Sequence, residues 1–317
     1  MMNQETIHIR KLTTGYPGKG GTKIVAKDID ATIRSGELTC LLGANGVGKS
    51  TLLRTLSAFQ PPVGGEIEIM GKKLTDYTDK QLATVIGVVL TEKCSLRNMT
   101  VEELVGMGRS PYTGFWGNLS KEDKNTVNDA IALVRIEDLK YRMVHTLSDG
   151  ERQKVMIAKA LAQETPVIFL DEPTAGVDPK ARREFWQMLH QLSDRGISIL
   201  VSTHYMDEAE RCHKVAYLSY GRLLANGTIA SIIASQNLIT MRTSGAGLTL
   251  LESQLQRLPD IEQTVIFGNQ LYITSRDEAK LKSALFAFTQ QGYEFCKVDT
   301  NLEDAFTYLM KNNCEKN

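Results

Sequence analysis

The chain has 317 residues, of which 42% are hydrophobic and 23% charged, an ordinary composition for a globular protein with a sizeable core. Lys plus Arg and Asp plus Glu both number 37, so the formal net charge is zero. This balance excludes a nucleic-acid binder held by bulk electrostatics, and we expect no nucleic-acid partner. Any membrane association is expected to come from docking to a protein partner.

Residues 1–10 are polar and lack the apolar stretch of a signal peptide. The longest apolar runs are strand-length, whereas a membrane-spanning helix needs about 20 apolar residues. The five cysteines are scattered and form no CxxC pair, which argues against a disulfide framework or a zinc site and fits a reducing cytosol. We therefore expect a cytoplasmic protein that is at most peripheral to a membrane.

The first two thirds of the chain alternate apolar strands with helices, a pattern that indicates a largely parallel α/β sheet. A polar, helical stretch at about residues 92–161 includes an aromatic loop at Pro111–Trp116 and predicts a helical subdomain. The predicted strands are Thr6–Lys11, Ile24–Ile33, Leu38–Leu42, Glu66–Met70, Val85–Leu90, Val167–Leu170 and Ile197–Ser202, with helices at Leu52–Phe59 and Lys180–Arg195.

After about Ala230 the pattern changes to a βαββαβ order followed by one more helix. It predicts a first domain at 1–230 and a small α+β domain at 231–317. The expected strands are Leu238–Thr243, Gln263–Phe267, Gln270–Thr274 and Tyr293–Val298, and the expected helices are Thr249–Leu258, Glu278–Gln290 and Leu302–Met310.

A glycine-rich loop follows the predicted strand Leu38–Leu42 and precedes a helix. Its sequence, from Gly43 to Thr51, matches G-x-x-x-x-G-K-[ST], and the strand–loop–helix context disfavours a chance glycine-rich turn. Glycines let the backbone N–H groups wrap a phosphate, so Lys49 is expected on the β- and γ-phosphates of a nucleotide and Ser50 on Mg²⁺. The predicted nucleotide-binding residues of this loop are Gly43, Asn45, Gly46, Gly48, Lys49, Ser50 and Thr51.

Two carboxylates, Asp171 and Glu172, directly follow the strand Val167–Leu170, which is predicted to be buried. Alone, they would more often mark an acidic turn than a site. Downstream of a phosphate loop and followed by Pro173, they predict that Asp171 reaches the Mg²⁺ shell. Glu172 is then placed to polarise a water for attack on the γ-phosphate.

With these motifs in place, the chain resembles the ATPases of ATP-binding cassette (ABC) transporters from Thr6 to about Thr228. Residues 147–151, Leu-Ser-Asp-Gly-Glu, are similar to the family's LSGGQ signature. Asp149 and Glu151 depart from that pattern, whereas Ser148 and Gly150, which carry γ-phosphate contacts in the family, are kept. The same segment also predicts a helix cap, with Ser148 as N-cap and Glu151 three residues later.

The resemblance implies roles for further residues. Tyr16 matches the aromatic residue that stacks on adenine in the family. Asp178 lies in a segment that resembles the loop crossing the dimer interface. His204 matches the switch histidine that contacts the γ-phosphate. The family has a glutamine after the strand Val85–Leu90, where this chain has Thr91 and then Glu92, so Thr91 is only a candidate Mg²⁺ contact.

The family's architecture is a P-loop NTPase core, RecA-like, with an inserted helical subdomain. It implies ATP and Mg²⁺ as cofactors and a homodimer, or paired ATPases, that sandwiches two ATP molecules. It also implies integral-membrane permease subunits as partners, at the cytoplasmic face of the membrane.

The class of ABC ATPase that the chain resembles changes within Asp171–Thr174. Residues 1–173 look like ATPases of iron-siderophore, haem and cobalamin importers, and residues 174–317 look like ATPases of type-2 exporters of drugs, lipids or polysaccharides. Docking to the permease is expected around Glu92–Leu119, which favours an importer. The exporter ATPase stays open as the alternative, and so does a nucleotide-sensing module without a transport role.

Overall fold

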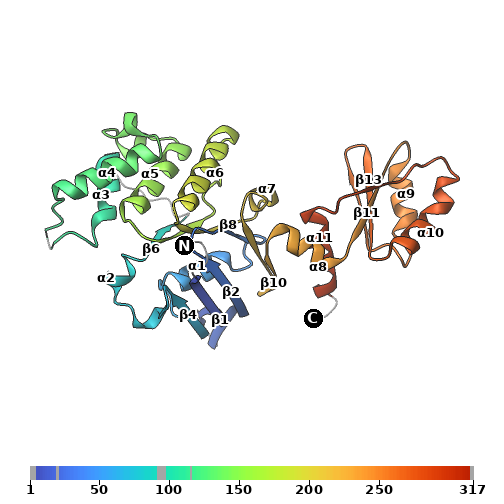
Figure 1. The fold of residues 1–317 in the computed structure, drawn as a ribbon, viewed down its shortest axis with the longest axis horizontal. Coiled ribbons are helices and arrows are strands. Elements are labelled where there is room, and N and C mark those ends of the chain that lie inside the picture. Colours follow the sequence, from blue (N-terminus) through green and yellow to red (C-terminus); the bar gives the residue numbers. More distant parts are fainter. Residues whose placement is uncertain (1–4, 19–20, 91–97, 115, 315–317) are drawn as a thin grey trace. The chain divides into compact units, whose positions relative to one another are not determined.

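The computed structural model describes residues 5–18, 21–90, 98–114 and 116–314, and these fall into two compact units (Figure 1). The first unit ends at Asn226 and the second begins at Gly227. The domain boundary predicted at residue 230 falls inside a helix, α8 (Ile229–Gln236), that the sequence analysis did not predict.

A six-stranded sheet forms the centre of the first unit, in the order β10-β9-β3-β8-β7-β6. Its described pairs β3·β8, β3·β9, β6·β7 and β7·β8 are all parallel, as the sequence predicted. All five residues of β3 and of β7 are buried. The strands are β3 (Leu38–Leu42), β6 (Ile86–Val89), β7 (Val167–Asp171), β8 (Ser198–Thr203), β9 (Lys214–Ser219) and β10 (Arg222–Gly227).

The first strands of the chain form a separate antiparallel sheet rather than part of the parallel one, in the order β2-β1-β4-β5. Pairing of Ile7 with Ile69 fixes its register, and one buried cluster joins both residues to Leu41, Phe169 and Leu53. The two sheets therefore share a core with α1. The strands are β1 (Glu5–Gly18), β2 (Gly21–Arg34), β4 (Gly64–Ile69) and β5 (Lys72–Lys73).

Three helices of the first unit, α3, α4 and α5, pack on one another and form a helical subdomain within residues 101–162 (Figure 1). Each begins with a capping box, in which the N-cap side chain and the side chain three residues later bond reciprocally to backbone N–H groups. The helices of this unit are α1 (Lys49–Leu56), α2 (Asp79–Leu82), α3 (Val101–Gly106), α4 (Lys121–Leu133), α5 (Asp149–Ala162), α6 (Pro179–Asp194) and α7 (Met206–Ala209).

The second unit is a four-stranded antiparallel sheet in the order β12-β13-β11-β14, the arrangement of a split βαβ fold. Leu251 and Leu255 of α9 and Leu281 and Leu285 of α10 form a buried cluster with Ile273 of the sheet. The strands are β11 (Ile239–Ser244), β12 (Gln263–Phe267), β13 (Gln270–Ser275) and β14 (Cys296–Val298). After α8, the helices are α9 (Leu248–Leu255), α10 (Glu278–Thr289) and α11 (Leu302–Cys314).

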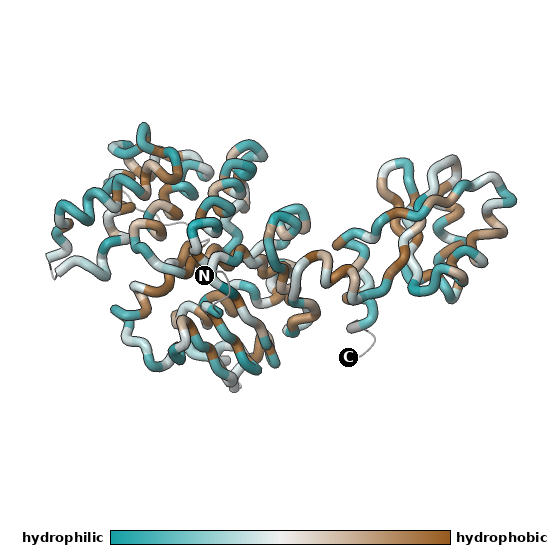
Figure 2. The backbone as a smooth tube through the Cα atoms, in the orientation of Figure 1, coloured by the Kyte–Doolittle hydropathy of each residue, from teal (hydrophilic) through white to brown (hydrophobic). Residues whose placement is uncertain are grey.

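The buried strands β3 and β7 are mostly hydrophobic, whereas most helices alternate between polar and apolar residues (Figure 2). This alternation is typical of helices that bury one face and expose the other. Among the described residues, no helix is long and apolar enough to cross a membrane.

Candidate functional site

The glycine-rich loop lies between the end of β3 and the start of α1, where close backbone packing excludes larger side chains. A Cβ atom on Gly43 would lie 2.5 Å from the Leu218 carbonyl oxygen. At Gly48 the φ angle is 111°, and a Cβ atom there would lie 2.4 Å from a methyl group of Val25. Only glycine fits both places, which leaves the backbone at the head of α1 open toward an approaching anion.

Lys49 is almost fully buried beneath this loop, and its ammonium group has three oxygen neighbours. It donates to the carbonyl oxygens of Gly43 at 2.9 Å and Ala44 at 3.1 Å. The third neighbour is Glu172 Oε1, at 3.1 Å from Lys49 Nζ. An ammonium has three N–H donors, so these oxygens occupy all of them.

The two carboxylates at the end of β7 are held by the neighbouring strand β8. Ser202 Oγ donates to Asp171 Oδ1 at 2.5 Å, and Asp171 is buried. The backbone N–H of Glu172 lies 3.1 Å from both the carbonyl oxygen and Oγ of Ser202. Glu172 has a φ angle of 45°, a left-handed conformation that is uncommon outside glycine. The sequence analysis did not single out Ser202.

His204 follows β8 and brings its ring to the same carboxylate. Its Nδ1 lies 3.6 Å from Glu172 Oε1, the oxygen that also faces Lys49. The imidazole ring lies against the ring of Tyr205, with the centroids 4.0 Å apart. The structure thus brings Lys49, Glu172 and His204 together around one oxygen atom.

Ser50 and Asp171 offer a hydroxyl and a carboxylate, the oxygen donors that Mg²⁺ prefers. Among the described residues no group of three or more His, Cys, Asp and Glu side chains could hold a metal ion. Mg²⁺ sites at nucleotides commonly use one or two protein oxygens plus phosphates and water, so the pair fits a shared site of that kind. Thr91, the other candidate ligand, lies outside the described residues.

Tyr16, the candidate adenine-stacking residue, lies on β1 opposite Lys23 of β2. Its side chain is 43% exposed, and Lys23 Nζ lies 5.7 Å from the ring centroid. An exposed aromatic ring offers a face to a planar base. Asn45 and Gly46 are likewise exposed, and Thr51 lies in the first turn of α1.

The segment with the signature-like sequence begins α5, and the predicted helix cap is confirmed. The backbone N–H of Glu151 donates to Ser148 Oγ at 3.3 Å, and the backbone N–H of Ser148 donates to Glu151 Oε2 at 2.8 Å. The Ser148 hydroxyl donates to the same carboxylate oxygen at 2.8 Å, and these two bonds from the backbone N–H and hydroxyl of Ser148 lower the pKa of the Glu151 carboxyl. Asp149 pairs with Arg152 at 3.2 Å, and Gly150 follows it in the first turn.

Asp178 caps α6 in the same manner. Its Oδ1 accepts from the backbone N–H groups of Lys180 and Ala181, each at 3.0 Å. Pro179 occupies the first helical position, where its missing N–H costs no hydrogen bond. The cap fixes the direction in which α6 leaves the segment that follows β7.

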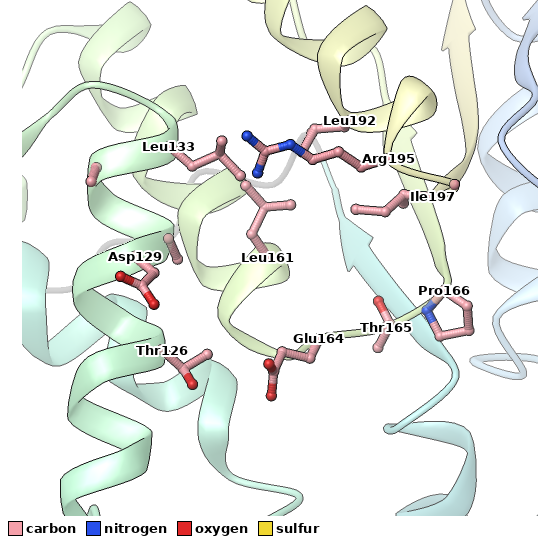
Figure 3. Close-up of a pocket in the computed structure, with 13 residues that line it drawn as sticks. Thr126, Asp129, Leu133, Leu161, Glu164, Thr165, Pro166, Leu192, Arg195 and Ile197 are labelled. Atoms are coloured by element: carbon pink, nitrogen blue, oxygen red, sulfur yellow. The ribbon is translucent and has the colours of Figure 1, made fainter.

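A cleft of about 820 Å³ lies away from these residues. It is lined by α4, by the C-terminal ends of α5 and α6 and by the segments that precede β7 and β8, with Leu133, Leu161 and Leu192 along its wall (Figure 3). No residue of the phosphate loop lines it. The cleft is therefore separate from the predicted nucleotide site.

Comparison with known proteins identifies the family. A profile of the family described as ABC transporter matches residues 26–175. The probable siderophore transport system ATP-binding protein YusV of Bacillus subtilis is 33% identical over 245 residues, which are 76% of this chain and 88% of that protein. The chain belongs to the ABC transporter family. It is an ATP-binding subunit of that family.

Other similar proteins cover different parts of this ABC subunit. The Nod factor export ATP-binding protein I of Cupriavidus pinatubonensis is 31% identical over 305 residues, 96% of this chain and 90% of that protein. The dimeric structure of MJ0796, a bacterial ABC transporter cassette, superposes with a TM-score of 0.63 at 26% identity over 70% of this chain and 98% of that one. The same cassette in a post-hydrolysis state, bound to ADP and Pi, superposes equally well. The predicted ABC ATPase fold is therefore confirmed, and its similarity to hydrolysing cassettes supports ATP hydrolysis in general.

Proposed function

We propose that this ABC subunit hydrolyses ATP to drive transport through a separate integral-membrane permease. The observation that carries the proposal is the convergence of Lys49 and His204 on Glu172 Oε1, at 3.1 and 3.6 Å, beside the buried Asp171. Lys49 and His204 supply positive and hydrogen-bonding groups for the γ-phosphate, and Glu172 orients the attacking water. Catalysis then proceeds by positioning and electrostatics, without a covalent intermediate.

In this proposal two chains sandwich two ATP molecules, with Mg²⁺ held by Ser50, Asp171 and the phosphates. Ser148 caps α5, whose first-turn N–H groups and helix dipole favour an anion. We infer that this helix end faces the phosphate loop of the other chain, and that Asp178 lies at the boundary between the chains. The MJ0796 cassette, described as dimeric, supports this arrangement.

Docking of the permease is expected within Glu92–Leu119, of which residues 92–97 and 115 lie outside the described part of the chain. Within it we propose the described members of residues 107–116, a segment that resembles siderophore, haem and cobalamin importers. Arg109 anchors this segment internally. Its Nε donates to Asp123 Oδ1 at 2.8 Å, and one terminal nitrogen donates to Glu164 Oε2 at 2.6 Å. The Tyr112 ring lies over the guanidinium, 4.0 Å away. These contacts hold Arg109 and Tyr112 in place, and we propose the exposed side chains of Met107 and Trp116 as the apolar contacts of the permease.

An exporter ATPase is the second candidate, and the extent of similarity favours it. The Nod factor exporter relative matches 96% of this chain, whereas the siderophore relative matches 76%. A match of 96% must include most of the second unit. Under this alternative the permease would be of the exporter type, and the second unit would take part in regulation or in dimer stability.

The two candidates differ in the permease that the protein binds. Tagged Glu172→Gln protein would be purified from membranes of the source organism, and co-purifying membrane proteins identified by mass spectrometry. A permease with about ten spans supports the importer and one with about six the exporter, because each span needs about 20 apolar residues and is countable from sequence.

Docking itself is tested by two matched substitutions. Met107→Glu places a charge on the proposed docking segment, and Met70→Glu places one on an equally exposed methionine in the turn between β4 and β5, both being 45% exposed. The first should reduce permease recovery and the second should not. Equal recovery with both variants would contradict docking at residues 107–116.

A further inference from the structure

Glu208 is a fully buried carboxylate with no role in the site described so far. It lies on the short helix α7, four residues after His204, and its exposed fraction is 0%. A polar, acidic sequence such as Met206–Ala209 predicts an exposed helix, so the burial is unexpected. A buried carboxylate is costly unless hydrogen bonds and a cation compensate it, so its contacts are informative.

The two oxygens of Glu208 accept from threonines that flank two catalytic candidates. Thr174 Oγ1 donates to Glu208 Oε1 at 2.5 Å, and Thr174 comes two residues after Glu172. Thr203 Oγ1 donates to Glu208 Oε2 at 2.7 Å, and Thr203 immediately precedes His204. One carboxylate therefore joins the segment after β7 to the segment after β8.

Through Arg182, the same carboxylate is connected to α6 and to Tyr205, whose ring packs against that of His204. Arg182 Nε lies 3.5 Å from Glu208 Oε1, and its guanidinium lies 4.8 Å from the Tyr205 ring centroid. Thr203 Oγ1 also accepts from the Tyr205 backbone N–H at 3.1 Å, which fixes the turn that carries His204. Arg182 lies in the second turn of the helix that Asp178 caps.

We propose that Glu208 is a positioning residue for ATP hydrolysis, whose carboxylate fixes the turns that carry Glu172 and His204 relative to each other. The inference rests on the proposed ATPase function. Glu172 has a left-handed backbone that costs energy unless its surroundings determine it, and the Thr174 contact holds the next residues of that turn. Arg182 extends the same constraint to the helix that begins at Asp178.

The test is Glu208→Gln, which keeps the shape of the side chain but replaces one acceptor oxygen with an NH₂ donor. One of the two threonine hydroxyls then faces a donor, and Arg182 loses its charged partner. We expect kcat to fall about 10- to 100-fold while the KM for ATP changes less than about twofold, because misplacement of catalytic groups acts mainly on the chemical step. Asp207→Asn, which removes a charge from an exposed residue of the same helix, should keep the wild-type kcat.

A double-mutant cycle separates positioning from general destabilisation. If Glu208 acts through His204, Glu208→Gln should reduce kcat much less in a His204→Ala background than in the wild type. An undiminished reduction there, or a Glu208→Gln variant as active as Asp207→Asn, would overturn the proposal.

A second pair of variants serves if Glu208→Gln does not fold. Thr203→Val removes the hydroxyl that bonds to Glu208 at nearly unchanged shape, and Thr203→Ser retains it. We expect the valine variant to lose turnover and the serine variant to keep most of it, whereas equal turnover would refute the role of this contact. A wild-type protein without ATPase activity would instead refute the proposed function.

Discussion

Glu172→Gln should tighten ATP binding as well as stop turnover. In the structure Lys49 is engaged by Glu172 Oε1 at 3.1 Å and by two loop carbonyl oxygens, with exposed side-chain fractions of 3% for Lys49 and 22% for Glu172. An incoming phosphate must compete with this carboxylate for the same ammonium. Removing the negative charge therefore lowers the cost of releasing Lys49 to the nucleotide.

The size of this effect follows from the geometry of the pair. At 3.1 Å and an effective dielectric constant of about 20, the Coulomb attraction is about 5 kcal/mol, most of it offset by desolvation. A hydrogen bond to a charged partner contributes about 1.5–3 kcal/mol net, and the neutral one that glutamine keeps contributes about 1 kcal/mol. The difference of about 0.5–2 kcal/mol corresponds to about 2- to 30-fold tighter ATP binding. Turnover should fall about 10²- to 10⁴-fold through loss of the residue that orients water.

Two assays measure the two effects separately. Isothermal titration calorimetry gives the Kd for ATP, and phosphate release gives kcat. Glu210→Gln, which neutralises an exposed carboxylate after α7, controls for the change in net charge. An unchanged or weaker Kd would refute the competition for Lys49, and retained turnover would refute the assignment of Glu172.

Three other substitutions probe the site and its support. Lys49→Ala should lose most nucleotide affinity, and an unchanged nucleotide titration would contradict its assignment. Arg109→Ala should lower the thermal unfolding temperature by several degrees, because Asp123 stays behind without its cation. Since hydrogen bonds from Arg109 and Ser120 lower the pKa of Asp123 to about 2, this stabilisation is complete above the usual pKa of 3.8 and is lost as pH falls toward 2. The variant should therefore differ from wild type less at pH 2 than at pH 7, and equal differences would contradict this. Gly108→Ala should cost about 1–3 kcal/mol in denaturant unfolding, because a Cβ atom there would lie 2.2 Å from a carbonyl oxygen of α5. Gly114→Ala meets nothing within 4 Å and should be neutral, so equal losses in both would refute the packing argument.

The sequence predicted the local elements of the fold better than their partners. β3 and β12 have the predicted bounds. β3 is a short, mostly apolar run before the glycine-rich loop, and β12 ends at the Gly268-Asn269 turn. Strands were predicted within β1 and β2, but not the separate antiparallel sheet that they form. That sheet depends on pairing of β1 with β2 and with β4, which the local pattern does not contain. β9, β10 and α8 were not predicted, and β9 has only four buried residues between polar ends.

Motif spacing located Lys49, Asp171, Glu172 and His204, but not the contacts between them. The chain folds so that β7 and β8 pair in parallel from Val167 and Ser198 onward, which brings Asp171 beside Ser202. That pairing joins segments about 30 residues apart in the sequence, so no local sequence pattern predicts it. Glu208 was missed for the same reason, because only tertiary packing distinguishes a buried carboxylate from an exposed one on a short polar helix.

The change of resemblance within Asp171–Thr174 divides the proposed catalytic site between two halves of the chain. Glu172 belongs to the importer-like half, and its backbone N–H bonds to Ser202 of the exporter-like half. The parallel pairing of β7 with β8, from Val167 and Ser198 to Asp171 and Ser202, spans this junction and joins the two halves of the proposed site. In our proposal, the segment that selects the permease lies wholly in the importer-like half, where Arg109 pairs with Asp123.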